Sequence, residues 1–222
     1  MNKRIKLMKI KICGLSPARD VQTCIDQNVF MLGFVSYKQS PRNIDLKEIN
    51  MLKNYNRKSS LYVSVCVNPT NEFIKENILG NFDYIQLHGS ETSERVKEIS
   101  KMGIKVIKAI KVKDQKDIAL YKNYEDIADL ILFDSTSMEK SQSISKDLLS
   151  KLPKGEKFGL AGAINLENVQ EYCQLGFNFL DLSSGLEKEN LKGYKDHLKI
   201  KKFIDKVNKI NENSSIQRVK PA

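Results

Sequence analysis

A cysteine and an aspartate stand at the ends of two apolar, strand-like segments of this chain. Cys13 lies near the end of residues 9–14, where isoleucines alternate with lysines, and Asp134 closes the apolar run 130–134. The C-terminal tips of strands are where α/β proteins usually place chemistry, and both side chains titrate and can exchange protons. A lone thiol is more often a packed core residue. An acidic residue that ends an apolar strand has few structural reasons to be there, which makes Asp134 the stronger candidate.

The alternation of the other strand-like segments predicts more polar side chains on the same inward face. These residues are Lys11, Gln86, His88, Lys108, Asp181 and Ser183. If the first and last strands are neighbours, Lys11 and Asp181 should form an ion pair, which is an alternative to a direct role in chemistry. His88 is either a hydrogen-bonded structural histidine or a group that touches substrate.

Two segments of small residues predict a phosphate site. Residues 160–163 include Gly162 and Ala163, and residues 181–185 include Ser184 and Gly185. Small residues let backbone N–H groups approach an anion closely. Arg42 follows the strand-like segment 30–35. Its planar guanidinium group can donate two parallel hydrogen bonds, which suits a second anion such as a carboxylate.

Strand-like and helix-like segments alternate along the whole chain. The predicted strands cover 9–14, 30–35, 61–67, 84–89, 104–110, 130–134, 158–162 and 179–183, each followed by a helical pattern. Eight such units predict a single-domain (β/α)8 barrel over residues 1–222, with a short loose tail from about residue 211. The alternative is an open doubly wound sheet, but no Gly-rich phosphate fingerprint follows the first strand.

Composition excludes several classes of protein. The 222 residues are 41% hydrophobic, and no apolar run approaches the ~20 residues of a membrane helix, so a cytoplasmic protein without membrane contact is expected. The net charge of +10 comes mainly from dispersed lysines, which favours a solvated surface over a nucleic-acid groove. Four scattered cysteines and two histidines suggest neither a metal site nor a disulfide framework.

A set of short motifs occurs in a fixed order along the chain. In sequence order they are Lys11-Ile-Cys-Gly-Leu15, Gly33-Phe-Val35, Ser40-Pro-Arg42, Val67-Asn-Pro69, Gln86-Leu-His-Gly-Ser-Glu91, Leu132-Phe-Asp134, Leu160-Ala-Gly162 and Ser183-Ser-Gly-Leu-Glu187. Together they resemble the phosphoribosylanthranilate isomerase family of tryptophan biosynthesis, and the resemblance runs from about residue 8 to residue 207.

This resemblance implies an Amadori rearrangement of N-(5-phosphoribosyl)anthranilate to 1-(2-carboxyphenylamino)-1-deoxyribulose 5-phosphate, without metal or organic cofactor. It implies that Cys13 is the general base, that Asp134 is the general acid and that Arg42 meets the anthranilate carboxylate. His88 and Asp181 are further substrate-binding candidates. Cys13 would then need help to become a thiolate, with Lys11 as a candidate, and Asp134 would need partial burial to hold a proton. We expect a small-molecule substrate, neither nucleic acid nor membrane as a partner, and a monomer rather than a homodimer.

The sequence departs from the family pattern in two loops. Residues 135–149 contain neither glycine nor an aromatic residue, and Ala163 stands where the family usually has a second glycine. A sugar-phosphate-binding barrel that is non-catalytic or altered therefore remains as an alternative. A related sugar-phosphate isomerase of histidine biosynthesis would have an aspartate in place of Cys13.

Overall fold

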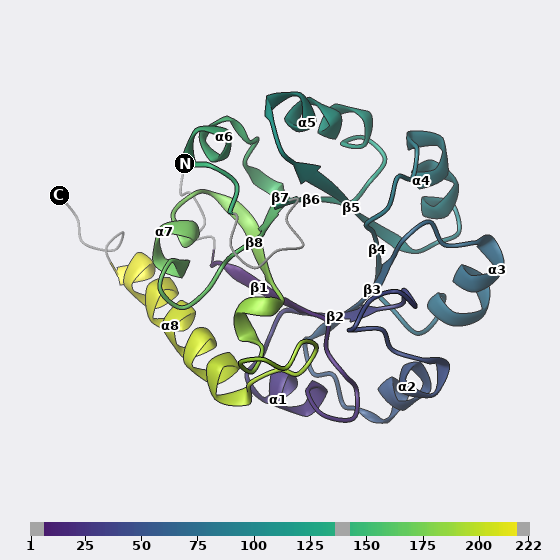
Figure 1. Ribbon diagram of the computed structural model, residues 1–222, viewed down its shortest axis with the longest axis horizontal. Helices are drawn as coiled ribbons and strands as arrows, with labels where there is room; N and C mark the ends of the chain where they lie inside the picture. Colours follow the sequence, from purple (N-terminus) through teal and green to yellow (C-terminus); the bar gives the residue numbers. More distant parts are fainter. Residues whose placement is uncertain (1–6, 136–142, 217–222) are drawn as a thin grey trace.

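The protein forms a closed barrel, seen here in a computed structural model that describes residues 7–135 and 143–216. Within these residues eight parallel strands pair in sequence order, and β8 pairs with β1 to close the sheet. Figure 1 shows the strands as a ring with the helices around it. The strands are β1 (Lys9–Cys13), β2 (Met31–Val35), β3 (Leu61–Cys66), β4 (Tyr84–Leu87), β5 (Lys105–Val112), β6 (Leu130–Ser135), β7 (Gly155–Ala161) and β8 (Phe177–Leu182).

Each strand leads into a helix on the outside of the barrel, which confirms the predicted (β/α)8 architecture. The helices are α1 (Val21–Asp26), α2 (Leu46–Met51), α3 (Asn71–Phe73), α4 (Ser93–Ser100), α5 (Gln115–Ala119), α6 (Lys146–Lys151), α7 (Val169–Cys173) and α8 (His197–Ile216). Side chains cap several of them: Asp45 accepts a hydrogen bond from the backbone N–H of Glu48 in α2, and Thr92 from that of Arg95 in α4. These caps satisfy backbone groups that a helix start leaves unpaired.

Two apolar clusters follow from the alternation of the strands. Ile12, Leu32 and Ile85 belong to the cluster between the strands and the helices, whereas Met31 and Val63 belong to the cluster inside the barrel. Polar side chains share the interior, because Lys11, Gln86 and Asp181 are all buried there. The strands therefore hold polar groups on the face that points into the barrel, as the sequence predicts for most of these residues.

Lys108 is an exception, and its predicted inward orientation is wrong. Its neighbours at alternate positions, Val106 and Ile110, belong to the cluster outside the barrel, whereas Ile107 and Ala109 belong to the inner one. The Lys108 ammonium group reaches the loop after β4, where it lies 2.8 Å from Glu91. Both faces of β5 carry apolar side chains, so its hydrophobic pattern alone does not fix which face is inward.

The last helix extends further than the sequence suggests. Residues 211–216, expected to belong to a loose tail, continue α8. Asn211 fixes this end, because its Oδ1 accepts a hydrogen bond from the backbone N–H of Met8 at 2.8 Å and its Nδ2 donates to the Met8 carbonyl. The polar composition of 211–216 concealed this contact with the start of the chain. Among the described residues no helix is long and apolar enough to cross a membrane.

Candidate active site

Cys13 ends β1 at the mouth of the barrel. Its neighbour in the register of β2 is Gly33, where a Cβ atom would lie 3.1 Å from the Lys11 ammonium and 3.3 Å from the Cys13 sulfur. The missing side chain at Gly33 therefore makes room for Lys11 and Cys13 side by side. Cys13 as a residue is partly exposed at this end of the barrel, although its sulfur is largely enclosed by neighbouring groups.

Lys11 and Asp181 form the predicted ion pair. Lys11 Nζ lies 2.8 Å from Asp181 Oδ2, and the two side chains are 0% and 7% exposed. Burial acts to lower the pKa of Lys11, but the charges of Asp181 and Cys13 and the hydrogen bonds to them together outweigh it, so the pKa is raised and the lysine stays cationic. The other oxygen of the carboxylate, Asp181 Oδ1, is buried without a hydrogen-bond partner in the described part of the chain. That oxygen is available to a hydroxyl group of a ligand.

The charges around Cys13 do not by themselves make it a thiolate. Burial raises the pKa of the Cys13 thiol above its ordinary value, and the nearby Asp181 carboxylate acts in the same direction. The positive charges of Lys11, Lys195 and Arg42 act to lower the pKa and offset only part of this effect. Lys11 thus has the expected influence on the thiol, but burial is stronger.

Asp134 lies near the end of β6, next to a histidine from β4. His88 Nε2 is 3.3 Å from Asp134 Oδ2, and both side chains are partly exposed. The amide nitrogen of Gln86 lies 3.4 Å from His88 Nδ1, so the ring is held between Gln86 and Asp134. His88 therefore contacts the Asp134 carboxyl group over the end of β5, which lies between β4 and β6.

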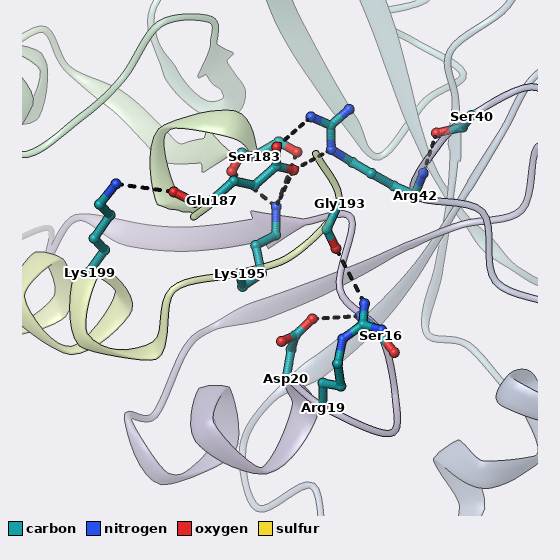
Figure 2. A network of polar contacts seen from close by, with 10 residues as sticks. All are labelled: Ser16, Arg19, Asp20, Ser40, Arg42, Ser183, Glu187, Gly193, Lys195 and Lys199. Atoms are coloured by element: carbon teal, nitrogen blue, oxygen red, sulfur yellow. Dashed lines mark hydrogen bonds and ion pairs between the residues drawn. The ribbon is translucent and has the colours of Figure 1, made fainter. Parts of the chain in front are cut away.

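Arg42 reaches the same end of the barrel from the loop after β2. Gly14, which has φ +74°, lies directly beneath it, because a Cβ atom there would be 2.4 Å from Arg42 Cδ. The guanidinium group makes a two-pronged contact with Glu187, with Nε 2.6 Å from Oε1 and Nη2 3.0 Å from Oε2. Figure 2 shows this contact and the buried Lys195 beside it.

The loops after β7 and β8 lie against each other, as the predicted phosphate site requires. A Cβ atom on Gly185 would lie 2.4 Å from the Ile164 carbonyl oxygen, so the two loops touch at that point. Gly162 and Ala163 both have positive φ, +102° and +50°, and Asn168 Nδ2 supports the turn by donating to the Ala163 carbonyl. Ala163, Ser184 and Gly185 are exposed, so their backbone groups are accessible. The atypical stretch 135–149 lies partly outside the described residues, because 136–142 are not among them.

Three residues near this site were not predicted as functional from the sequence. Glu187 and Lys195 form the cluster with Arg42, and Lys111 lies on the inner face of β5 beside Asp134 in the strand register. Lys111 was missed because the strand was predicted to end at residue 110, although the positions 107, 109 and 111 alternate regularly. Nothing in the local pattern around Lys195 reveals its burial.

The arrangement combines a thiol and a carboxyl group with places for two anions. Such a site can move protons on a small molecule that carries a carboxylate near Arg42 and a phosphate near the loops after β7 and β8. Within the described residues no group of three or more His, Cys, Asp or Glu side chains is placed to hold a metal ion.

Comparisons with known proteins agree with this geometry. The family model described as N-(5'phosphoribosyl)anthranilate (PRA) isomerase matches residues 10–206. An N-(5'-phosphoribosyl)anthranilate isomerase of Agrobacterium fabrum is 34% identical over 90% of this chain and 94% of its own length, and one of Aquifex aeolicus is 36% identical over 89% and 97%. The crystal structure of the isomerase from Thermotoga maritima is 28% identical, with a TM-score of 0.79, and covers 91% of this chain and 100% of its own.

Proposed function

This chain belongs to the N-(5'-phosphoribosyl)anthranilate isomerase family of tryptophan biosynthesis, and we propose that Cys13 is the general base and Asp134 the general acid of its reaction. The observation that carries the proposal is the placement of the two groups. They end separate strands of one barrel, on the inner face and at the same mouth, where a single small molecule can contact both.

The reaction needs one proton donor and one proton acceptor. Asp134 in its protonated form gives a proton to the ribose ring oxygen, so the C1–O bond breaks and the ring opens to an iminium ion. Cys13 as a thiolate then takes the proton from C2, and the electron pair of the C–H bond neutralises the iminium to give an enolamine. Loss of the enol proton and protonation of C1 give the ketone, and proton exchange with water restores Cys13 and Asp134 to their starting states.

The remaining groups bind and orient the substrate. Arg42 meets the anthranilate carboxylate with its planar fork. The unpaired oxygen of Asp181 accepts a hydrogen bond from a ribose hydroxyl, and His88 both orients Asp134 and contacts the sugar. Backbone N–H groups of Gly162, Ala163, Ser184 and Gly185 hold the phosphate, which suits the exposure of three of these residues and the contact between their loops.

A solved isomerase complex supports a small-molecule substrate for this chain. It contains reduced 1-(o-carboxyphenylamino)-1-deoxyribulose 5-phosphate, has a TM-score of 0.76 and is 28% identical to this chain. We further propose that this chain acts as a monomer, since the site described here is built from residues of one chain, and light scattering of the purified protein tests that state. The four free thiols suit a reducing compartment such as the cytoplasm.

A turnover assay tests the proposed function. The fluorescence of the anthranilate group in freshly prepared phosphoribosylanthranilate should fall after addition of enzyme, faster than in a blank without protein. The rate should be proportional to enzyme concentration. A rate equal to the blank at micromolar enzyme would contradict the proposal.

A further inference from the structure

Glu187 holds one particular edge of the Arg42 guanidinium. Its two carboxylate oxygens accept hydrogen bonds from Nε at 2.6 Å and from Nη2 at 3.0 Å. These two nitrogens form the side edge of the planar group. Glu187 itself is fixed, because Lys199 donates to its backbone carbonyl at 3.1 Å.

The terminal edge of the same guanidinium is left for a ligand. Within the described residues no group makes a hydrogen bond or an ion pair with Nη1, and Figure 2 shows that the third nitrogen points away from Glu187. Of five N–H donors Glu187 uses two, and Nη1 with the second hydrogen of Nη2 forms another planar fork. The Arg42 side chain is 23% exposed, so this fork can be reached. Arg42 can therefore hold Glu187 and a second carboxylate at the same time.

Lys195 sets the charge of the cluster. Its side chain is 0% exposed, and Nζ lies 3.3 Å from Glu187 Oε1, 3.0 Å from the Ser183 carbonyl and 3.3 Å from Ser183 Oγ. Burial acts to raise the pKa of Glu187, but Arg42 and Lys195 outweigh it and hold that pKa below its usual range. Burial lowers the pKa of Lys195 below its ordinary value, and the charge of Glu187 opposes this shift. When Lys195 is protonated, the two cations and one anion leave a net charge of +1, whereas Arg42 and Glu187 alone would be neutral.

We propose that Glu187 and Lys195 are positioning residues for the substrate carboxylate. Glu187 aims the free edge of Arg42 into the barrel mouth, and Lys195 keeps the cluster cationic so that this edge attracts an anion. The neighbouring loops hold the arrangement together, because a Cβ atom on Gly193 would lie 2.9 Å from the Pro41 carbonyl, next to Arg42. This inference deepens the proposed function and rests on it.

A pair of ligands that differ only in the carboxylate tests the inference. The first is the reduced product, 1-(2-carboxyphenylamino)-1-deoxyribitol 5-phosphate, and the second is the same compound with a hydrogen in place of the carboxyl group. Calorimetry gives the affinity of the wild type and of Glu187→Gln, Lys195→Met and Arg42→Lys for each. Glu189→Gln, an exposed carboxylate in the same loop, is the matched control.

We expect Glu187→Gln and Lys195→Met to weaken binding of the carboxylated ligand by about tenfold, as Arg42→Lys does, because each disturbs one charge-assisted contact. Their affinity for the ligand without the carboxylate should stay within about twofold of the wild type. Glu189→Gln should change neither affinity.

If Glu187→Gln weakens binding of both ligands equally, the inference is overturned, because Glu187 would then have a general structural role. Unchanged affinity of this variant for both ligands would also overturn the inference. If Glu187→Gln does not fold, Glu187→Asp takes its place, since it keeps the charge and loses the reach to Arg42. Failure of the wild type to bind either ligand would instead overturn the proposed function itself.

Discussion

The ammonium nitrogen of Lys11 lies 2.8 Å from Oδ2 of Asp181 inside the barrel, in the register that joins β1 to β8. Lys11→Met would leave the buried Asp181 carboxylate without its partner. Breaking one side of a buried pair typically costs about 3–5 kcal/mol, so urea denaturation should show a loss of that order. The double variant Lys11→Met/Asp181→Leu should recover most of the loss, because two apolar side chains need no partner. A single variant as stable as the wild type would contradict this account.

Eight strand–helix units in the sequence were enough to predict the barrel, and the alternation within the first and last strands then predicted this pair. The same reasoning failed for Lys108, because β5 is apolar on both faces and its phase can be chosen either way. It could not reveal the contact between Arg42 and Glu187, which are 145 positions apart and meet only because two loops fold over the same barrel end. Glu187 ends the motif that begins at Ser183, but no periodic pattern in a sequence predicts which side chain a loop residue will pair with.

Ala163 holds a backbone conformation that favours glycine, with φ +50°. The left-handed region costs a residue with a Cβ atom roughly 1–2 kcal/mol, and the extra freedom of glycine in the unfolded chain offsets about 0.4–1 kcal/mol. Ala163→Gly should therefore raise the free energy of unfolding by up to about 1.5 kcal/mol. Ala119→Gly at the end of α5, where φ is −61°, is the control and should lower it. A loss of stability in Ala163→Gly would contradict the strain at this turn.

Ser184 offers a cleaner test of the phosphate site than Gly185. A valine at Gly185 would collide with the Ile164 carbonyl whether or not phosphate binds there. Ser184 is exposed, and Ser184→Asp adds a negative charge near the expected phosphate, so KM should rise on the order of tenfold. Ser184→Asn is the neutral control, and inhibition by inorganic phosphate should weaken in the aspartate variant only. Equal KM values for the two variants would place the phosphate elsewhere.

The pH profile of kcat/KM reports the ionisation of the free enzyme. A base must lose its proton before it acts, and burial raises the pKa of Cys13, so the ascending limb should lie above the ordinary thiol value of about 8.5. Cys13→Asp replaces the thiol by a carboxylate with an ordinary pKa of about 3.9, so the limb should move to acid pH even if the rate is lower. If the ascending limb of Cys13→Asp stays at the pH of the wild-type limb, another group is the base.

Turnover of Cys13→Ala and Asp134→Asn, measured with the melting temperature of each protein, tests the acid–base assignment most directly. General acid–base catalysis is typically worth about 10²–10⁴-fold, so each variant should lower kcat by at least about a hundredfold, with a smaller change in KM. The melting temperatures should stay close to that of the wild type, because both residues lie at the partly exposed mouth of the barrel. Near-normal kcat in both variants would contradict the assignment, and a lower melting temperature with intact kcat in Cys13→Ala would identify a packed structural thiol.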